Sequence, residues 1–176
     1  MPLEEMKTSL RQLNGMDEEG FVAAIGHVFE HSPWIARQTF AKRPFASLAA
    51  LHEALVKTVR QSSDNETLDL IRAHPDLVGK MARAGGLTRE STAEQDAAGL
   101  TALSAAEVQQ FDRYNAQYRE RFGFPFVICA RENKKDAILA AFPVRLNQSR
   151  EAEIDTTLTE IARIARMRLL DAIEKD

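Results

Sequence analysis

Residues 104–130 read SAAEVQQFDRYNAQYRERFGFPFVICA, a helical stretch followed at once by a segment with a different pattern. Ser104 and Glu107 have the spacing of a capping box, which opens a helix, and Gly123 is a residue type that commonly closes one. The next seven residues, 124–130, are apolar, partly β-branched and interrupted by a proline. This composition predicts an extended segment rather than a continued helix.

Outside this stretch, nearly every segment has apolar residues at the helical period of three to four. Asp17 is a candidate N-cap, and Ser32 precedes a proline at the first helical position. We expect helices over about 17–29, 32–40, 48–59, 68–74, 89–98, 104–122, 135–146 and 150–173. Residues 79–88 contain three glycines and are predicted to form a loop. The chain is therefore predicted to be all-α: a single compact domain, residues 1–176, of about eight helices with one short extended segment around residues 124–130.

The length and charge of the chain indicate a single domain and argue against a nucleic-acid-binding protein. With 176 residues, one domain is the default, and a hydrophobic fraction of 44% is enough for a core. The 23 basic and 26 acidic residues give a net charge of −3, and neither sign forms a long block. A nucleic-acid binder would normally carry a basic stripe, so we expect no nucleic-acid partner.

The sequence also bears on compartment and membrane contact. No apolar run approaches the length of about 20 residues that spans a bilayer. The N-terminal stretch Met1–Glu5 is acidic and lacks the apolar core of a signal peptide. The lone Cys129 excludes an intrachain disulfide, which fits a reducing compartment. We therefore expect a soluble, cytoplasmic protein with no membrane partner.

His74 is the first candidate for chemistry. Pro75 disfavours helical geometry in the residue before it, so the preceding helix is predicted to end near His74. The carbonyl end of a helix stabilises a cation, which suits a histidine that holds and delivers a proton near neutral pH. The alternative is that His74 only caps the last carbonyls of its helix.

Ser91, Glu94 and Gln95 form a second polar cluster. Ser91 and Glu94 have capping-box spacing, which would explain both residues without any ligand. The functional interpretation is that a carboxylated substrate sits at this helix N-terminus, with Glu94 and Gln95 turned toward it. The sequence leaves both interpretations open.

Arg168 lies inside the apolar stripe of the last predicted helix. That stripe consists of Ile154, Leu158, Ile161, Ala165 and Leu169. A guanidinium facing the core needs a partner, because an unpaired buried charge is very costly. The partner is either an internal acid or a substrate carboxylate or carbonyl, which arginine clamps well. Arg163 points nearly opposite to Ile161 and is predicted to be a surface charge.

The extended segment and the histidines supply the remaining candidates. Backbone amides around residues 124–130 must find partners outside a helix, and a urea or imide ring offers matching donors and acceptors. A buried connector is the alternative. His27 and His31 have the i, i+4 spacing of a metal pair, but no third ligand of the right type is evident, so we expect no metal site. Cys129 is predicted to be an inert core thiol.

Taken together, four motifs resemble the 2-oxo-4-hydroxy-4-carboxy-5-ureidoimidazoline (OHCU) decarboxylase family. They occur in order and with matching gaps over about residues 8–172. They are His74-Pro75-Asp76-Leu77; Ser91-x-x-Glu94-Gln95 with Ala98-Gly99-Leu100; Tyr118 through Phe122-Gly123-Phe124-Pro125-Phe126-Val127-Ile128; and Ile161-Ala162-Arg163-Ile164-Ala165-x-x-Arg168-Leu169.

The resemblance implies an all-helical homodimer that uses no cofactor and converts this small-molecule substrate to (S)-allantoin and carbon dioxide in urate breakdown. It implies that His74 is the catalytic histidine and Glu94 its partner carboxylate. The substrate-binding positions that it implies are Pro75, Ser91, Gln95, Phe126, Val127, Ile128, Cys129, Ala130 and Arg168. Two alternatives stay open: a non-catalytic helical interaction module, and an enzyme of the same fold that acts on a different ureido acid.

Overall fold

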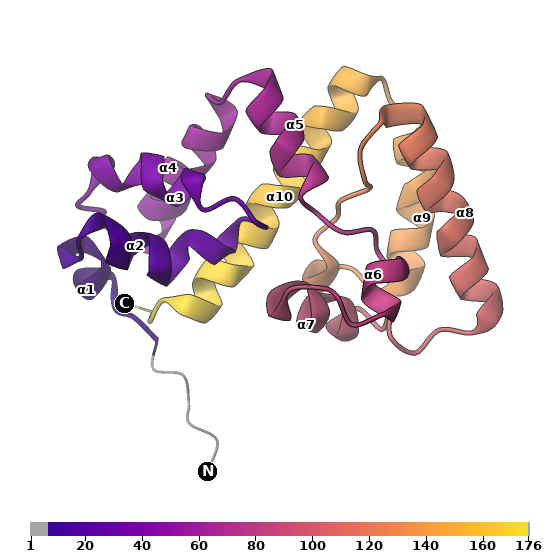
Figure 1. The fold of residues 1–176 in the computed structure, drawn as a ribbon, viewed down its shortest axis with the longest axis horizontal. Coiled ribbons are helices and arrows are strands. Elements are labelled where there is room, and N and C mark those ends of the chain that lie inside the picture. Colours follow the sequence, from indigo (N-terminus) through magenta and orange to yellow (C-terminus); the bar gives the residue numbers. More distant parts are fainter. Residues whose placement is uncertain (1–6, 176) are drawn as a thin grey trace, which may run out of the picture. The chain divides into compact units, whose positions relative to one another are not determined.

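The computed structural model describes residues 7–175, and within them the chain is all-α, as predicted (Figure 1). Thr8 and Ile173 form an isolated bridge, and no strand occurs among these residues. The α-helices are α1 (Leu10–Gly15), α2 (Glu18–Ile25), α3 (Trp34–Thr39), α4 (Leu48–Arg60), α5 (Asp64–Arg72), α6 (Lys80–Arg83), α7 (Arg89–Ala97), α8 (Ala105–Phe122), α9 (Lys135–Leu146) and α10 (Arg150–Ala172). Single 3-10 turns are η1 (Gly26–Val28), η2 (Phe40–Lys42) and η3 (Ala130–Glu132). The predicted absence of a signal peptide at Met1–Glu5 concerns residues outside the described range.

The described chain groups into two compact units. Residues 7–70 and 165–175 form the first unit, and residues 71–164 form the second. The expectation of one domain over residues 1–176 stays a prediction. No helix within residues 7–175 is both long and apolar enough to cross a membrane.

In the first unit, α3 packs against both α2 and α4 around an apolar core. The Asp17 side chain caps α2 by accepting the Gly20 N–H at 2.8 Å, as predicted. Fully buried side chains from these helices fill the core, among them Phe21, Ile25, Ile35, Leu51 and Leu55. Arg168 belongs to this unit through the C-terminal part of α10.

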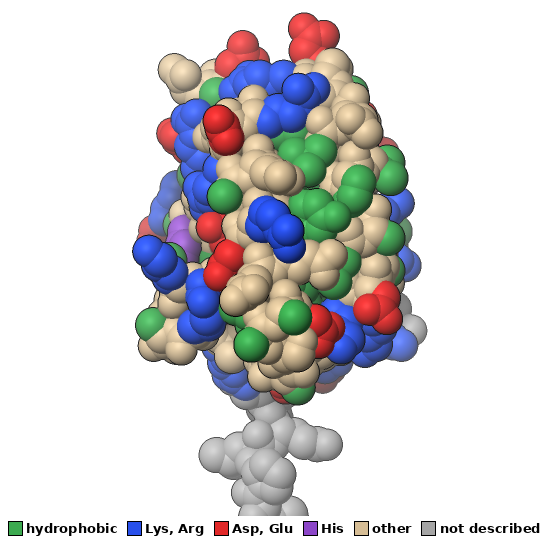
Figure 2. Space-filling model, turned by 90° about the vertical axis from the view of Figure 1, so that its right-hand side faces the viewer, with side chains coloured by type: hydrophobic (Ala, Val, Ile, Leu, Met, Phe, Trp, Pro, Cys, Tyr) green, Lys and Arg blue, Asp and Glu red, His purple; other side chains and the backbone are tan. Residues whose placement is uncertain are grey.

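In the second unit, α8 and α9 lie side by side over an aromatic core (Figure 1). The predicted capping box of Ser104 and Glu107 opens α8, and Gly123 ends it. The core rings include Phe111, Tyr118, Phe122, Phe124, Phe126 and Phe142, and the Phe126 and Phe142 rings stack with centroids 3.9 Å apart. Figure 2 shows further hydrophobic side chains gathered on the face that carries α8 and α9, with basic side chains beside them.

Residues 124–129 contain no helix, as predicted, but Ala130, the last residue of the predicted extended segment, begins the 3-10 turn η3. Phe124, Phe126, Val127, Ile128 and Cys129 are all buried there. Since the segment lies between α8 and η3, its polar backbone groups lack helical partners and depend on side chains or ligands.

Three local expectations were wrong. Short α1 was not expected; it begins with a capping box made by Ser9 and Gln12. The helix predicted over 17–29 ends at Ile25 and continues as a 3-10 turn, and His31 has a positive φ of 46°. His27 and His31 therefore do not share a helical face. The predicted loop at 79–88 contains the one-turn helix α6.

Replacing Gly123 with alanine should destabilise the protein by about 1 kcal/mol, because φ at this position is +77° and a side chain disfavours the left-handed region. A Cβ atom at Gly123 would meet nothing within 4 Å, so the cost is one of backbone conformation. Urea unfolding measures it. Gly15→Ala is the matched control, since its Cβ also meets nothing and its φ is not positive. Equal unfolding midpoints for the two variants would contradict this account.

Candidate functional site

His74 lies in a tight turn just beyond α5, as its proline neighbour predicts. The helix ends at Arg72, and the His74 N–H donates to the Ile71 carbonyl at 3.1 Å. His74 is only 6% exposed. A histidine held this far from bulk water belongs to an enclosed polar environment rather than to a solvated helix end.

Side chains from two helices hold the turn after His74. From α7, Gln95 accepts the Val78 N–H on Oε1 at 3.0 Å. From α8, the Asn115 Nδ2 donates to the Leu77 carbonyl at 2.8 Å. Also from α8, the Arg119 Nε donates to both carboxylate oxygens of Asp76, at 2.9 and 3.1 Å. The last three residues of the sequence His74-Pro75-Asp76-Leu77-Val78 are thus each fixed by a different side chain.

Val78 has an unusual backbone conformation within this turn. Its φ is +56°, and it is buried at 4% exposure. A β-branched residue in the left-handed region is strained by about 1–3 kcal/mol, and such strain persists only where surrounding contacts enforce it. The hydrogen bond from the Val78 N–H to Gln95 is one such contact. Strain of this kind concentrates at functional sites, which supports a functional role for the turn.

The capping explanation for Ser91 and Glu94 is wrong. Thr88 is the N-cap of α7, and its hydroxyl accepts the Ser91 N–H at 3.2 Å. Ser91 therefore lies inside the helix rather than before it. Ser91, Glu94 and Gln95 are exposed by only 7%, 9% and 4%. Capping does not explain why a carboxylate and two neutral polar groups are buried on one short helix. Their burial favours the interpretation that they face a substrate.

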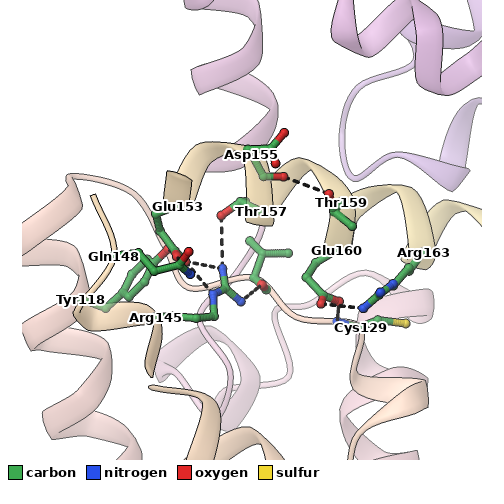
Figure 3. Close-up of polar contacts among 11 residues, drawn as sticks. Tyr118, Cys129, Arg145, Gln148, Glu153, Asp155, Thr157, Thr159, Glu160 and Arg163 are labelled. Atoms are coloured by element: carbon green, nitrogen blue, oxygen red, sulfur yellow. Dashed lines mark hydrogen bonds and ion pairs between the residues drawn. The ribbon is translucent and has the colours of Figure 1, made fainter. Parts of the chain in front are cut away.

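Two side chains hold the extended segment by its backbone. The Arg145 Nη1 donates to the Val127 carbonyl at 2.5 Å. The Glu160 Oε2 accepts the Cys129 N–H at 3.1 Å. Figure 3 shows Glu160 between Cys129 and Arg163, and Arg145 beside Glu153 and Thr157. The Cys129 N–H, predicted to be offered to a ring substrate, is thus occupied by an internal carboxylate.

Ile128, between those two contacts, keeps both of its backbone groups unpaired. Within residues 7–175, neither its N–H nor its carbonyl has a hydrogen-bond partner, and the residue is 8% exposed. Buried backbone groups are nearly always paired, so an adjacent unpaired donor and acceptor mark a place for a ligand or ordered water.

Helix α7 packs against η3, which follows the extended segment directly. The Lys134 Nζ also donates to the Ala97 carbonyl at the end of α7, at 2.6 Å. Burial, together with the charges of Glu132, Glu160 and Glu94, raises the pKa of the Cys129 thiol to about 11. Glu94 is thus within electrostatic reach of Cys129. The structure brings the His74 turn, α7 and the extended segment together in the unit 71–164.

Arg168 is buried, as predicted, and its partner is an internal acid. The Arg168 Nη2 donates to the Glu30 Oε2 at 2.8 Å, and the two side chains are 4% and 1% exposed. Its Nη1 donates to the His27 carbonyl at 3.2 Å. All three residues belong to the first unit. The role of Arg168 in substrate binding stays a prediction.

Arg163 has a different environment. Its side chain is 53% exposed, as expected for a surface charge, and its Nη1 donates to the Glu160 Oε1 at 3.0 Å. Arg163 therefore stands next to the carboxylate that holds the Cys129 N–H, within the same unit as His74.

Several buried charged residues escaped the sequence analysis. They are Glu30, Arg145, Glu153 and Glu160. A signal existed for two of them, because Glu153, Thr157 and Glu160 follow helical spacing along one face of α10 beside the apolar stripe. Among the described residues, no group of three or more His, Cys, Asp or Glu is placed to hold a metal ion. A shallow depression lined by Gln117, Glu120, Arg121 and Leu146 contains none of the candidate residues.

Replacing Gln95 with leucine should destabilise the protein by about 1–3 kcal/mol, because the Val78 N–H would be buried without a partner. Denaturant unfolding measures the loss. Gln109→Leu on exposed α8 surface is the control and should stay within about 0.5 kcal/mol of the parent. If the two variants unfold alike, Gln95 does not brace the His74 turn.

Known proteins were compared with the chain. The sequence model of the family described as OHCU decarboxylase matches residues 14–170. A 2-oxo-4-hydroxy-4-carboxy-5-ureidoimidazoline decarboxylase of Haloferax volcanii is 40% identical over 96% of this chain and 98% of that protein. One of Amia calva is 39% identical over 94% of each. A crystal structure of (S)-allantoin synthase superposes with a TM-score of 0.75 at 27% identity, over 95% of this chain and 54% of that chain. The chain therefore belongs to the OHCU decarboxylase family.

Proposed function

We propose that this protein decarboxylates 2-oxo-4-hydroxy-4-carboxy-5-ureidoimidazoline to (S)-allantoin and carbon dioxide. The family match and the names of its relatives support the substrate. The observation that carries the proposal is that one unit holds His74, Glu94 and the unpaired backbone groups of Ile128.

The chemistry of the substrate supplies its own electron sink. The carboxylate leaves a carbon next to a ring C=N, so the electron pair of the breaking C–C bond moves into the ring. The reaction then needs a proton delivered to one face of the former C=N carbon, which bears the ureido group, while the hydroxyl on the carbon that lost carbon dioxide gives up its proton and becomes the carbonyl of allantoin. The protein must hold the carboxylate out of the ring plane, stabilise the developing charge and present the proton donor from one side.

The side chains divide this work. His74 is the proton donor, and the Glu94 carboxylate binds the substrate and influences the protonation state of His74. Ser91 and Gln95 on α7 and Pro75 in the His74 turn are further substrate-binding residues. The segment Phe126–Ala130 offers the Ile128 N–H and carbonyl, which match the alternating acceptors and donors of a ureido ring.

Three further properties belong to the proposal. The reaction proceeds without a cofactor, because the ring itself accepts the electron pair. The protein acts in the cytoplasm, as its composition predicts, and as a homodimer, as the family resemblance implies. Val144 on α9 is 66% exposed, which fits an apolar contact surface. Light scattering of the purified protein measures the oligomeric state directly.

Replacing His74 with asparagine should lower kcat by about 10²–10⁴-fold, because the general acid is lost. Freshly generated substrate and circular dichroism of the allantoin formed measure rate and handedness together. The wild-type product should be enantiopure, and the variant product should approach that of the uncatalysed blank.

His31→Asn is the matched control for this substitution. His31 is exposed, and its φ of 46° is one that asparagine tolerates. It should keep wild-type activity. A His74→Asn variant as fast and as selective as the His31→Asn variant would rule out His74 as the proton donor.

Methionine substitutions should separate the two candidate arginines. Arg168→Met removes the buried cation that pairs with Glu30 and should cost about 3–5 kcal/mol of stability. Arg163→Met removes an exposed cation, so it should leave unfolding nearly unchanged while raising KM if Arg163 binds the substrate carboxylate. Unfolding and steady-state kinetics are measured on both variants. Normal stability with a raised KM for Arg168→Met would instead assign the substrate contact to Arg168.

A further inference from the structure

Two buried charged side chains grip the peptide groups on either side of Ile128. Arg145 holds the Val127 carbonyl, and Glu160 holds the Cys129 N–H. Neither side chain was among the residues expected to act on a substrate. Their contacts do, however, fix the direction of the Ile128 N–H and carbonyl, which have no hydrogen-bond partner within residues 7–175.

The geometry follows from the planar trans peptide. The bond between Val127 and Ile128 is trans, so its C=O and N–H point in opposite directions. Because Arg145 binds the Val127 carbonyl, the Ile128 N–H must point away from the Arg145 guanidinium. By the same reasoning, the Ile128 carbonyl points away from the Glu160 carboxylate, which holds the other end of the next peptide.

The Arg145 side chain is itself held firmly. Its Nε donates to the Glu153 Oε1 at 2.6 Å, its Nη2 forms an ion pair with the same oxygen at 2.5 Å, and the two side chains are 6% and 0% exposed (Figure 3). Its Nη2 also donates to the Thr157 hydroxyl at 3.2 Å. The guanidinium carbon lies 4.2 Å from the centroid of the Phe126 ring. The planar fork therefore has almost no freedom to turn away from the Val127 carbonyl.

Two neutral side chains also donate hydrogen bonds to the Glu153 carboxylate. The Tyr118 hydroxyl donates to its Oε1 at 2.5 Å, and the Gln148 Nε2 donates to its Oε2 at 2.9 Å. Burial, reinforced by the hydrogen bond to Glu153, raises the pKa of Tyr118, so the phenol stays a donor. A buried ion pair is weak support for stability, since apolar residues of similar volume often do as well. A buried ion pair whose polar atoms are all hydrogen-bonded instead fixes the positions of the groups it contacts.

We propose that Arg145 and Glu160 are positioning residues that aim the Ile128 N–H and carbonyl at the ureido ring of the substrate. The inference rests on the proposed function and adds to it the residues that set the ring's orientation. They act through the backbone and do not touch the ring. Because ring orientation decides which face receives the proton, these residues govern the handedness of the product as well as affinity.

Glu160 gives the sharper test, because a glutamine there keeps an oxygen for the Cys129 N–H whereas a leucine does not. Glu160→Leu should raise KM about tenfold and lower the enantiomeric excess of allantoin. Glu160→Gln should stay within about threefold of wild type and keep the excess. Glu151→Leu, an exposed position on the same helix, is the control and should behave as wild type. A purely structural role for Glu160 would change unfolding but not handedness.

Arg145→Lys is the second, independent variant. Lysine keeps the charge opposite Glu153 but cannot span Glu153, Thr157 and the Val127 carbonyl at once. It should raise KM and lower the enantiomeric excess at unchanged circular dichroism of the fold. The inference is overturned if Glu160→Leu matches Glu151→Leu in KM and handedness, or if Glu160→Gln and Glu160→Leu lose both equally.

Calorimetric titration with (S)-allantoin separates failure of the inference from failure of the proposed function. A wild-type protein that binds allantoin without turning over substrate would defeat the proposed function alone. The same variants then test the inference through Kd, with a loss of about tenfold expected for Glu160→Leu. A wild-type protein that neither binds allantoin nor turns over substrate would defeat both.

Discussion

The buried ion pair between Arg145 and Glu153 is the interaction on which the candidate site depends most. Taking two charges out of water is expensive, and the cost is met here by hydrogen bonds to every part of the carboxylate. The consequence of this ion pair is a fixed backbone geometry. An extended segment without helical or sheet partners acquires a fixed peptide plane at Val127, and the neighbouring Ile128 groups acquire fixed directions. A segment free to rotate would offer a ring substrate no consistent orientation.

The turn that follows His74 is also held in a fixed conformation by side chains. Gln95, Asn115 and Arg119 each hold one residue of the turn, and Val78 bears the strain. Proton delivery to one face of a planar ring requires the donor and the ring to be fixed independently, because rotation of either would expose the other face. Side chains from α7 and α8 fix the turn of the proposed donor His74, and side chains from α9 and α10 fix the backbone proposed to contact the ring. The proposed decarboxylation then depends on the orientation of the ring and the delivery of one proton.

Local signals in the sequence predicted much of this arrangement. The capping box at Ser104, the stop at Gly123 and the apolar run after it gave the extended segment its correct place. Ser91 was misassigned as a possible cap because Thr88, three residues earlier, is equally suited to that position and has priority in the structure. The partner of Arg168 could not be found from spacing, since Glu30 lies 138 residues away in the chain. The partner of Arg145 could not be predicted either, because it is a backbone carbonyl 18 residues away and every residue has such a group.

The most direct measurement is an amide NMR titration of the ¹⁵N-labelled protein with (S)-allantoin. The account predicts that the Ile128 amide exchanges with solvent faster than the Cys129 amide in the free protein, since only the latter donates to Glu160. On adding allantoin, the Ile128 resonance should shift strongly and become protected. An Ile128 amide that is already protected in the free protein, or that does not move while allantoin binds, would contradict the account.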